Sequence, residues 1–138
     1  MLVTRLAELR EQQRLAELAR ARNEEQQQRS SLEQLRNYRE EYCRQIERGG
    51  SGIGGAAHMA NFMRFISDID AASELQQRHV DTSVEVREAA SIEWQQQYAR
   101  RTSLQGLVDK ALKQERYEAD RQQQKSAEDA WLINHHRQ

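Results

Sequence analysis

A single cluster of glycines divides this chain into two parts. Five glycines fall within the seven residues 49–55. Because glycine loses more backbone freedom on folding than any other residue, a continuous helix through such a cluster is unfavourable. The rest of the chain has one further glycine and no proline, so no other segment is expected to interrupt a helix. The sequence predicts a helix over about 2–47, a hinge at 48–56, a second helix over about 57–133 and a frayed tail at 134–138.

The composition favours long helices over a compact core. Apolar residues make up 37% of the chain and charged residues 31%. The formal net charge is only -1, so self-repulsion does not hold the chain unfolded. Glutamine, glutamate, arginine, alanine and leucine are abundant, and all of them are good helix formers. We therefore expect an all-α protein whose helices join along narrow apolar seams.

Each arm carries an apolar stripe with spacings of three and four residues. In the first arm, a heptad frame joins Leu18, Leu32 and Ile46 to the polar Glu25 and Gln28, which weaken it. The early leucines do not keep this frame, because it breaks by one residue between positions 9 and 15. Neither arm could be stable alone, so we predict a long antiparallel two-helix coiled-coil hairpin. The residues expected in the hairpin core are Leu32, Leu35, Tyr42, Ile46, Met59, Phe62, Ile66, Val80 and Trp94.

The unequal lengths of the arms predict an overhang. If Ile46 faces Met59, then Leu2 lies opposite Ser103, and the second arm extends beyond about residue 104 without a partner. A shift of register that lets the first arm reach further is the alternative. If the overhang is present, we expect a partner protein or self-association to cover an apolar cluster at its start. This cluster consists of Leu104, Leu107, Val108, Ala111 and Leu112.

No pattern for catalysis or metal binding stands out. The glycine cluster fits the dinucleotide motif GxGxxG, but a helix rather than a strand is expected before it, and no Gly-Lys-Ser/Thr follows. The four histidines lack the spacing of metal ligands. Cys43 is the only cysteine, which excludes an internal disulfide and fits a reducing compartment. We expect no enzyme activity, no cofactor and no metal.

Charge and hydropathy limit the classes of partner and the cellular location that fit this sequence. Twenty-one basic residues balance 22 acidic ones, which argues against nucleic acid as a partner. No apolar run approaches the length of a membrane span, and the first residues are unlike a signal peptide. A cytoplasmic protein that binds other proteins is expected.

Aromatic residues gather on both sides of the expected hinge. Tyr38 and Tyr42 precede it, and Phe62 and Phe65 follow it. If Phe62 faces the first arm, Phe65 and Ala72 lie at the edge of the seam or outside it. This strip is either a binding surface or a wider local core that Tyr38 and Tyr42 cover.

These motifs together resemble the FliJ family of flagellar export proteins. The resemblance covers most of residues 32–129 and includes Trp94, midway along the second arm. Its other parts are a tyrosine motif ending the first arm, an Asn-aromatic-x-x-Phe start to the second, and a charged tail. In this chain they read Leu35-Arg36-Asn37-Tyr38-Arg39-Glu40-Glu41-Tyr42, Asn61-Phe62-Met63-Arg64-Phe65, and Arg121-Gln122-Gln123-Gln124-Lys125-Ser126-Ala127-Glu128-Asp129.

The resemblance implies a soluble part of the flagellar type III export apparatus, peripherally associated with the inner membrane and monomeric alone. The hairpin of this family is similar to the central stalk of a rotary ATPase, and its open end enters the export ATPase hexamer. Further partners are the cytoplasmic domain of the export gate and the export chaperones. By position, the gate-binding strip is Phe65, Ile69, Ala72 and Gln76, with Gln76 at a position where the family often has histidine. The ATPase contacts expected at the open end are Arg101, Leu104, Val108, Lys110, Ala111, Lys113 and Arg116.

Two other functions fit the same pattern. One is the equivalent stalk of a virulence type III secretion system, and the other is a self-associating coiled-coil scaffold. Concentration-dependent mass would favour the scaffold, because a stalk should stay monomeric.

Overall fold

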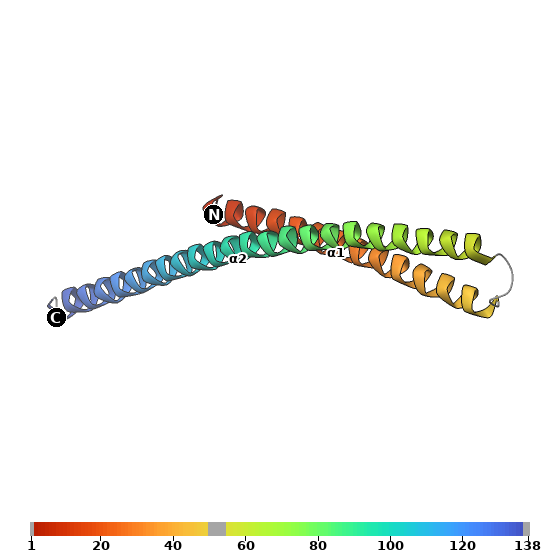
Figure 1. Ribbon diagram of the computed structural model, residues 1–138. Helices are drawn as coiled ribbons and strands as arrows, with labels where there is room; N and C mark the ends of the chain where they lie inside the picture. Colours follow the sequence, from red (N-terminus) through yellow and green to blue (C-terminus); the bar gives the residue numbers. More distant parts are fainter. Residues whose placement is uncertain (1, 50–54, 137–138) are drawn as a thin grey trace. The chain divides into compact units, whose positions relative to one another are not determined.

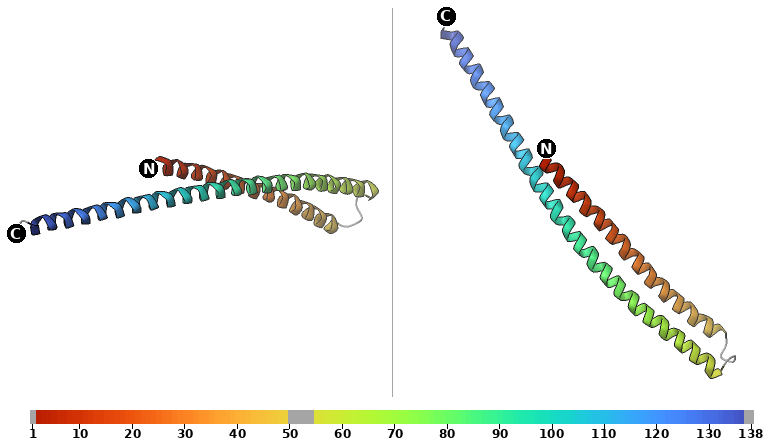
Figure 2. Two further views of the ribbon diagram at one scale, coloured as in Figure 1. Left: turned by 90° about the vertical axis from the view of Figure 1, so that its left-hand side faces the viewer. Right: turned by 90° about the horizontal axis from the view of Figure 1, so that it is seen from above.

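The computed structural model describes residues 2–49 and 55–136, which form two long helices (Figure 1). Helix α1 spans Leu2–Arg48 and helix α2 spans Gly55–His136. The two helices run antiparallel and pack on each other, and the described residues contain no strand (Figure 2). The predicted all-α helical hairpin is confirmed. Helix α2 continues to His136, beyond the end expected at 133, and the central part of the expected hinge, residues 50–54, lies outside the described residues.

The helix ends at the glycine cluster have local causes. The backbone N–H of Gly49 donates a hydrogen bond of 2.9 Å to the carbonyl of Gln45, and α1 ends at the residue before it. Glycine is common just after a helix because its backbone can leave the helical conformation at little steric cost. Helix α2 begins at Gly55, whose φ of 50° lies in the left-handed region that other residues rarely adopt.

The chain divides into two compact units, which we describe separately. The central unit is Gln12–Gln95, and the terminal unit is Met1–Glu11 with Gln96–Gln138. In each unit, a stretch of α1 packs against a stretch of α2.

The seam of the central unit follows the predicted heptad frame of α1. All nine frame positions are buried or half-buried. These are residues 18, 21, 25, 28, 32, 35, 39, 42 and 46. Leu18 and Val80 are almost completely enclosed, with 1% of their surface exposed. This regular burial every three and four residues is the pattern of a coiled-coil seam.

Most of the residues expected in the hairpin core lie in the seam. Leu32 and Val80 are buried, and six others are half-buried: Leu35, Tyr42, Ile46, Phe62, Ile66 and Trp94. Met59 is the exception, because 56% of its surface is exposed. It lies one helical turn nearer the start of α2 than Phe62, whose ring already stacks on Tyr42. Met59 therefore lies beyond the aromatic layer, on the side of the glycine cluster.

The polar interruptions of the seam meet one another across it. Arg87 donates a hydrogen bond to Glu25, with 2.5 Å between the nitrogen and oxygen atoms. The side-chain amide of Gln76 donates to both the backbone carbonyl and the side-chain oxygen of Gln28, at 2.9 and 2.7 Å. Because matched polar groups in a coiled-coil seam fit only one alignment, these pairs specify the register at a cost in stability.

The terminal unit corrects the expected register. Arg101 forms an ion pair with Glu11, so α1 reaches further along α2 than the register with Leu2 opposite Ser103 would allow. Thr4 and Ala7 are buried, which extends the heptad frame to the start of α1 without the expected break. Leu2, Leu6 and Leu9 therefore lie outside the seam, because the continuous frame places Thr4 and Ala7 in it instead.

The predicted overhang begins later than expected. Leu104 and Val108 are half-buried, so the first arm reaches these two residues, as the alternative register required. From Asp109 to His136, every residue of α2 is exposed. We call this stretch the free α2 segment, the blue end of the helix in Figure 1.

Candidate functional site

The free α2 segment is the longest continuous surface of the terminal unit that no described residue covers. Its large apolar side chains are Leu112, Tyr117, Trp131, Leu132 and Ile133, and each has at least 41% of its surface exposed. Trp131 stacks on His135 of the same helix, with 3.9 Å between the ring centroids. Basic and acidic residues are interspersed between the two apolar ends. A long exposed helix with apolar groups at both ends is suited to binding protein.

The structure separates the seven residues expected to contact an ATPase. Lys110, Ala111, Lys113 and Arg116 lie exposed on the free α2 segment. The other three, Arg101, Leu104 and Val108, are half-buried. Arg101 is held by its ion pair with Glu11 and lies over the ring of Tyr98, 5.3 Å from its centroid. These three residues thus contribute to the packing of the terminal unit.

The strip expected to bind the export gate is largely covered. Ile69 is buried in the seam, and Gln76 is half-buried and bonded to Gln28. Phe65 is half-buried, and only Ala72 is exposed. The four positions therefore do not form a continuous open surface, because Ile69 and Gln76 lie in the seam.

Phe65 belongs to an aromatic cluster rather than to an open surface. Its ring lies 4.1 Å from that of Tyr42 and meets Tyr38 edge-on at 5.7 Å, centroid to centroid. Phe62 stacks on Tyr42 at 5.7 Å. Of the two interpretations of the aromatic strip, this geometry supports the wider local core. Tyr38 keeps 58% of its surface exposed, so the cluster still presents one aromatic ring to solvent.

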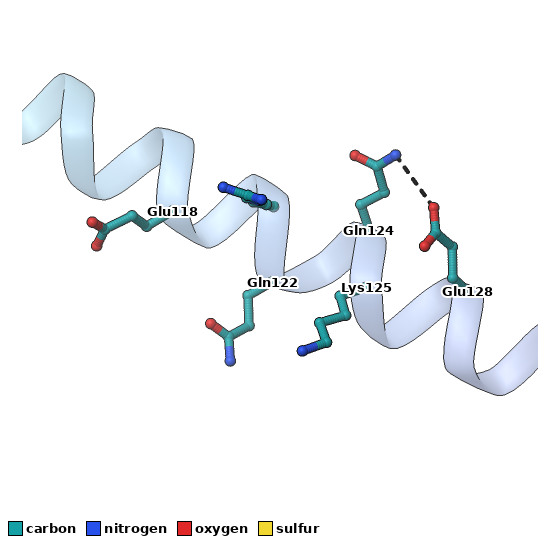
Figure 3. A pocket seen from close by; sticks show the side chains of 6 residues that line it. Glu118, Gln122, Gln124, Lys125 and Glu128 are labelled. Carbon is teal, nitrogen blue, oxygen red and sulfur yellow. Dashed lines mark hydrogen bonds between the residues drawn. The ribbon is translucent and has the colours of Figure 1, made fainter.

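The surface hollows among the described residues are shallow and few residues enclose them; one lies between α1 and α2 of the central unit, lined by residues that include Glu24 and His79. Another is lined by residues of the free α2 segment alone, including Glu118, Lys125 and Glu128 (Figure 3). Among the described residues, no group of three or more histidine, cysteine or acidic side chains could hold a metal ion.

One carboxyl group has a shifted acidity for a structural reason. The pKa of Glu25 is lowered mainly by the hydrogen bond from Arg87, with a further contribution from Arg29. Both partners stabilise the carboxylate form. The ion pair between Glu25 and Arg87 therefore contributes to the contact between the two helices.

The whole described chain agrees with one protein family. Residues 2–138 match the profile of the flagellar FliJ proteins. The chain belongs to the FliJ family. Membership indicates a component of the flagellar protein export apparatus, in a family of adaptors rather than enzymes. No curated protein and no solved structure matches this FliJ-family chain. In the described parts of its two helices, no stretch is long and apolar enough to cross a membrane.

Sequence reasoning missed the outward direction of the first leucines. Leu2, Leu6 and Leu9 have the spacing of a seam, but they are exposed. The available signal was the heptad frame itself, since extending it backward from Leu18 by whole heptads reaches Glu11 and Thr4.

Proposed function

We propose that this FliJ-family chain is a stalk and adaptor of the flagellar type III export apparatus. In this proposal, the free α2 segment enters the export ATPase hexamer, where Lys110, Ala111, Lys113 and Arg116 contact the ring. The observation that carries the proposal is the complete exposure of α2 from Asp109 to His136, which leaves a long helix available to a partner. The protein acts in the cytoplasm, as a monomer, at the periphery of the inner membrane.

The proposal places the export gate at the aromatic cluster of the central unit. Ala72 and the exposed ring of Tyr38 would contact the gate's cytoplasmic domain. Phe65 would shape this surface from its half-buried position, and Ile69 and Gln76 would act through the seam beneath it. Handling of export chaperones belongs to the same adaptor role.

A truncation after Val108 tests the ATPase contact. All the described residues that it removes, Asp109 to His136, are exposed, so the packed part of the terminal unit should stay folded. We expect the truncated chain to keep its helical circular dichroism signal per residue and to lose stimulation of ATP hydrolysis by the export ATPase. Undiminished binding and stimulation would refute the assignment to the free α2 segment.

A matched variant separates loss of charge from loss of length. Replacing Lys110, Lys113 and Arg116 together by glutamine keeps good helix formers at all three positions. We expect weaker ATPase binding, most clearly at low salt, because salt screens contacts between exposed charges.

The alternative of a self-associating scaffold has one observation in its favour. Trp131, Leu132 and Ile133 are exposed at the end of the free α2 segment and could pair with a second copy. Sedimentation at increasing concentration tests it. A constant monomer mass at micromolar concentration would support the adaptor, and a rising mass lost in the truncated chain would support the scaffold.

A further inference from the structure

The start of α1 has an apolar face that points away from the seam. Leu2, Leu6 and Leu9 expose 75%, 45% and 47% of their surface. At about 100° per residue, these three side chains fall within about 60° of one another around the helix. We call them the outer leucine face.

The buried residues of the same helix fix the direction of this face. Thr4 and Ala7 are buried, and Glu11 pairs with Arg101 across the seam. The centre of this seam side lies about 170° from the centre of the outer leucine face. The leucines therefore lie on the side of α1 opposite α2, where no described residue covers them.

The distribution of residue types around α1 suggests that the exposed leucines have a function of their own. In this part of the seam, α1 contributes small or polar residues, whereas its leucines are turned outward. If packing against α2 were the only requirement, the larger apolar side chains would be expected on the seam side. Spacing at i, i+4 and i+7 is the pattern by which an amphipathic helix presents anchors to a partner.

The charges beside the outer leucine face define the partner's chemistry. Arg5 and Arg10 lie about 70° to either side of it. The acidic residues of this stretch lie away from it: Glu11 faces Arg101, and half-buried Glu8 pairs with Arg5 at 3.8 Å. The face thus has a basic residue on both flanks. In helix pairs, such flanking positions select partners of opposite charge.

We propose that the outer leucine face is a docking surface for an amphipathic helix of another protein, one whose apolar stripe is flanked by acidic side chains. A second copy of this chain fits less well, because its own Arg5 and Arg10 would meet the same arginines. The surface is distinct from the free α2 segment and does not depend on the proposed function.

A binding assay with designed peptides tests this proposal. The probe is a fluorescein-labelled helical peptide of about three heptads with leucines on one stripe and glutamates on both flanks. Its matched control has lysines in place of the glutamates. We titrate each with the full chain and follow fluorescence anisotropy at low and high salt. We expect the lysine-flanked peptide to bind at least about tenfold more weakly, and binding of the glutamate-flanked peptide to weaken with salt.

Variants of the full chain locate the surface. Leu6→Ser combined with Leu9→Ser should weaken the binding of the glutamate-flanked peptide by at least about tenfold. Leu75→Ser, which changes a leucine of similar exposure elsewhere on the chain, should leave binding within about twofold. All three substitutions are at exposed positions, so circular dichroism should show unchanged helix content.

Three outcomes would overturn the proposal. The first is that the glutamate-flanked peptide does not bind, or binds the doubly substituted chain equally well. The second is leucine-dependent binding to vesicles of anionic phospholipid without peptide binding, which would make the face a membrane contact. The third is a dimer of the parent chain that the double substitution abolishes, which would assign the face to a second copy.

Discussion

The seam of the central unit and the free α2 segment are both helical, but the physical reasons differ. In the seam, side chains of α1 and α2 enclose one another, and Leu18 and Val80 are almost fully buried. In the free α2 segment, every residue is exposed, so tertiary packing contributes little to its helicity. What remains there is intrinsic propensity and local pairs, such as the hydrogen bond from Gln124 to Glu128 one turn away.

Because of this difference, substitutions in the two regions should affect different properties. A change in the seam alters the free energy of unfolding, because it removes contacts or leaves polar groups without partners. A change on the free α2 segment alters local helicity and whatever the segment binds. Stability and binding can therefore be measured separately in this protein.

The largest expected effect comes from a cavity in the seam. Leu18→Ala should lower the free energy of unfolding by about 2–5 kcal/mol, the usual cost of truncating a buried leucine. Urea unfolding followed by circular dichroism measures it. Tyr117→Ala on the free α2 segment is the control, expected to change stability by less than about 0.5 kcal/mol. Equal destabilisation of the two variants would contradict the claim that packing stabilises the seam and not the free α2 segment.

A smaller effect is expected at the aromatic cluster. Phe65 is half-buried against Tyr42 and Tyr38, so Phe65→Ala should lower stability by roughly 2 kcal/mol, about half the cost of a fully buried phenylalanine. Exposed Ala72→Gln should leave stability nearly unchanged. Binding to the gate's cytoplasmic domain should fall in both variants. Weaker gate binding by Phe65→Ala at full stability would instead place the ring on the surface.

The hairpin could be predicted because its causes are local in the sequence. The glycine cluster fixes the division into two helices, and the heptad frame from Leu18 to Ile46 fixes the face that α1 buries. Both depend on residue type and spacing alone. The absence of proline and the abundance of helix formers account for the length of the helices.

The register could not be predicted in the same way, because it depends on pairs that are distant in sequence. The leucines at 2, 6 and 9 suggested a seam by spacing, but Glu11 pairs with Arg101 and turns them outward. The polar residues at 25 and 28 looked like weak points, yet each meets a polar partner on α2. Gln76 of the expected gate strip is such a partner, and its bond to Gln28 could not be read from the spacing of either helix.

The Glu25–Arg87 pair makes part of the seam's stability depend on pH. The pKa of Glu25 is lowered in the folded chain, chiefly by the hydrogen bond from Arg87. Its contribution is therefore complete above the ordinary glutamate pKa and is lost as the pH falls through the lowered value. A double-mutant cycle with Glu25→Gln and Arg87→Gln, measured from neutral to strongly acidic pH, should give a coupling energy that decreases as Glu25 becomes protonated. A coupling energy that stays constant across this range would mean that the ionised carboxylate does not stabilise the pair.

The smallest effect on unfolding is expected from a glycine in the free α2 segment. Ala119→Gly should weaken the helix locally by about 1 kcal/mol, since no burial compensates for the backbone entropy. Hydrogen exchange should speed up near residue 119, while the urea midpoint stays at the parent value. Ala21→Gly makes the same change at a buried seam position and should lower the midpoint, because it also removes a packed methyl group. A lowered midpoint in Ala119→Gly would show that the free α2 segment takes part in cooperative unfolding, and that exposure alone does not separate the two regions.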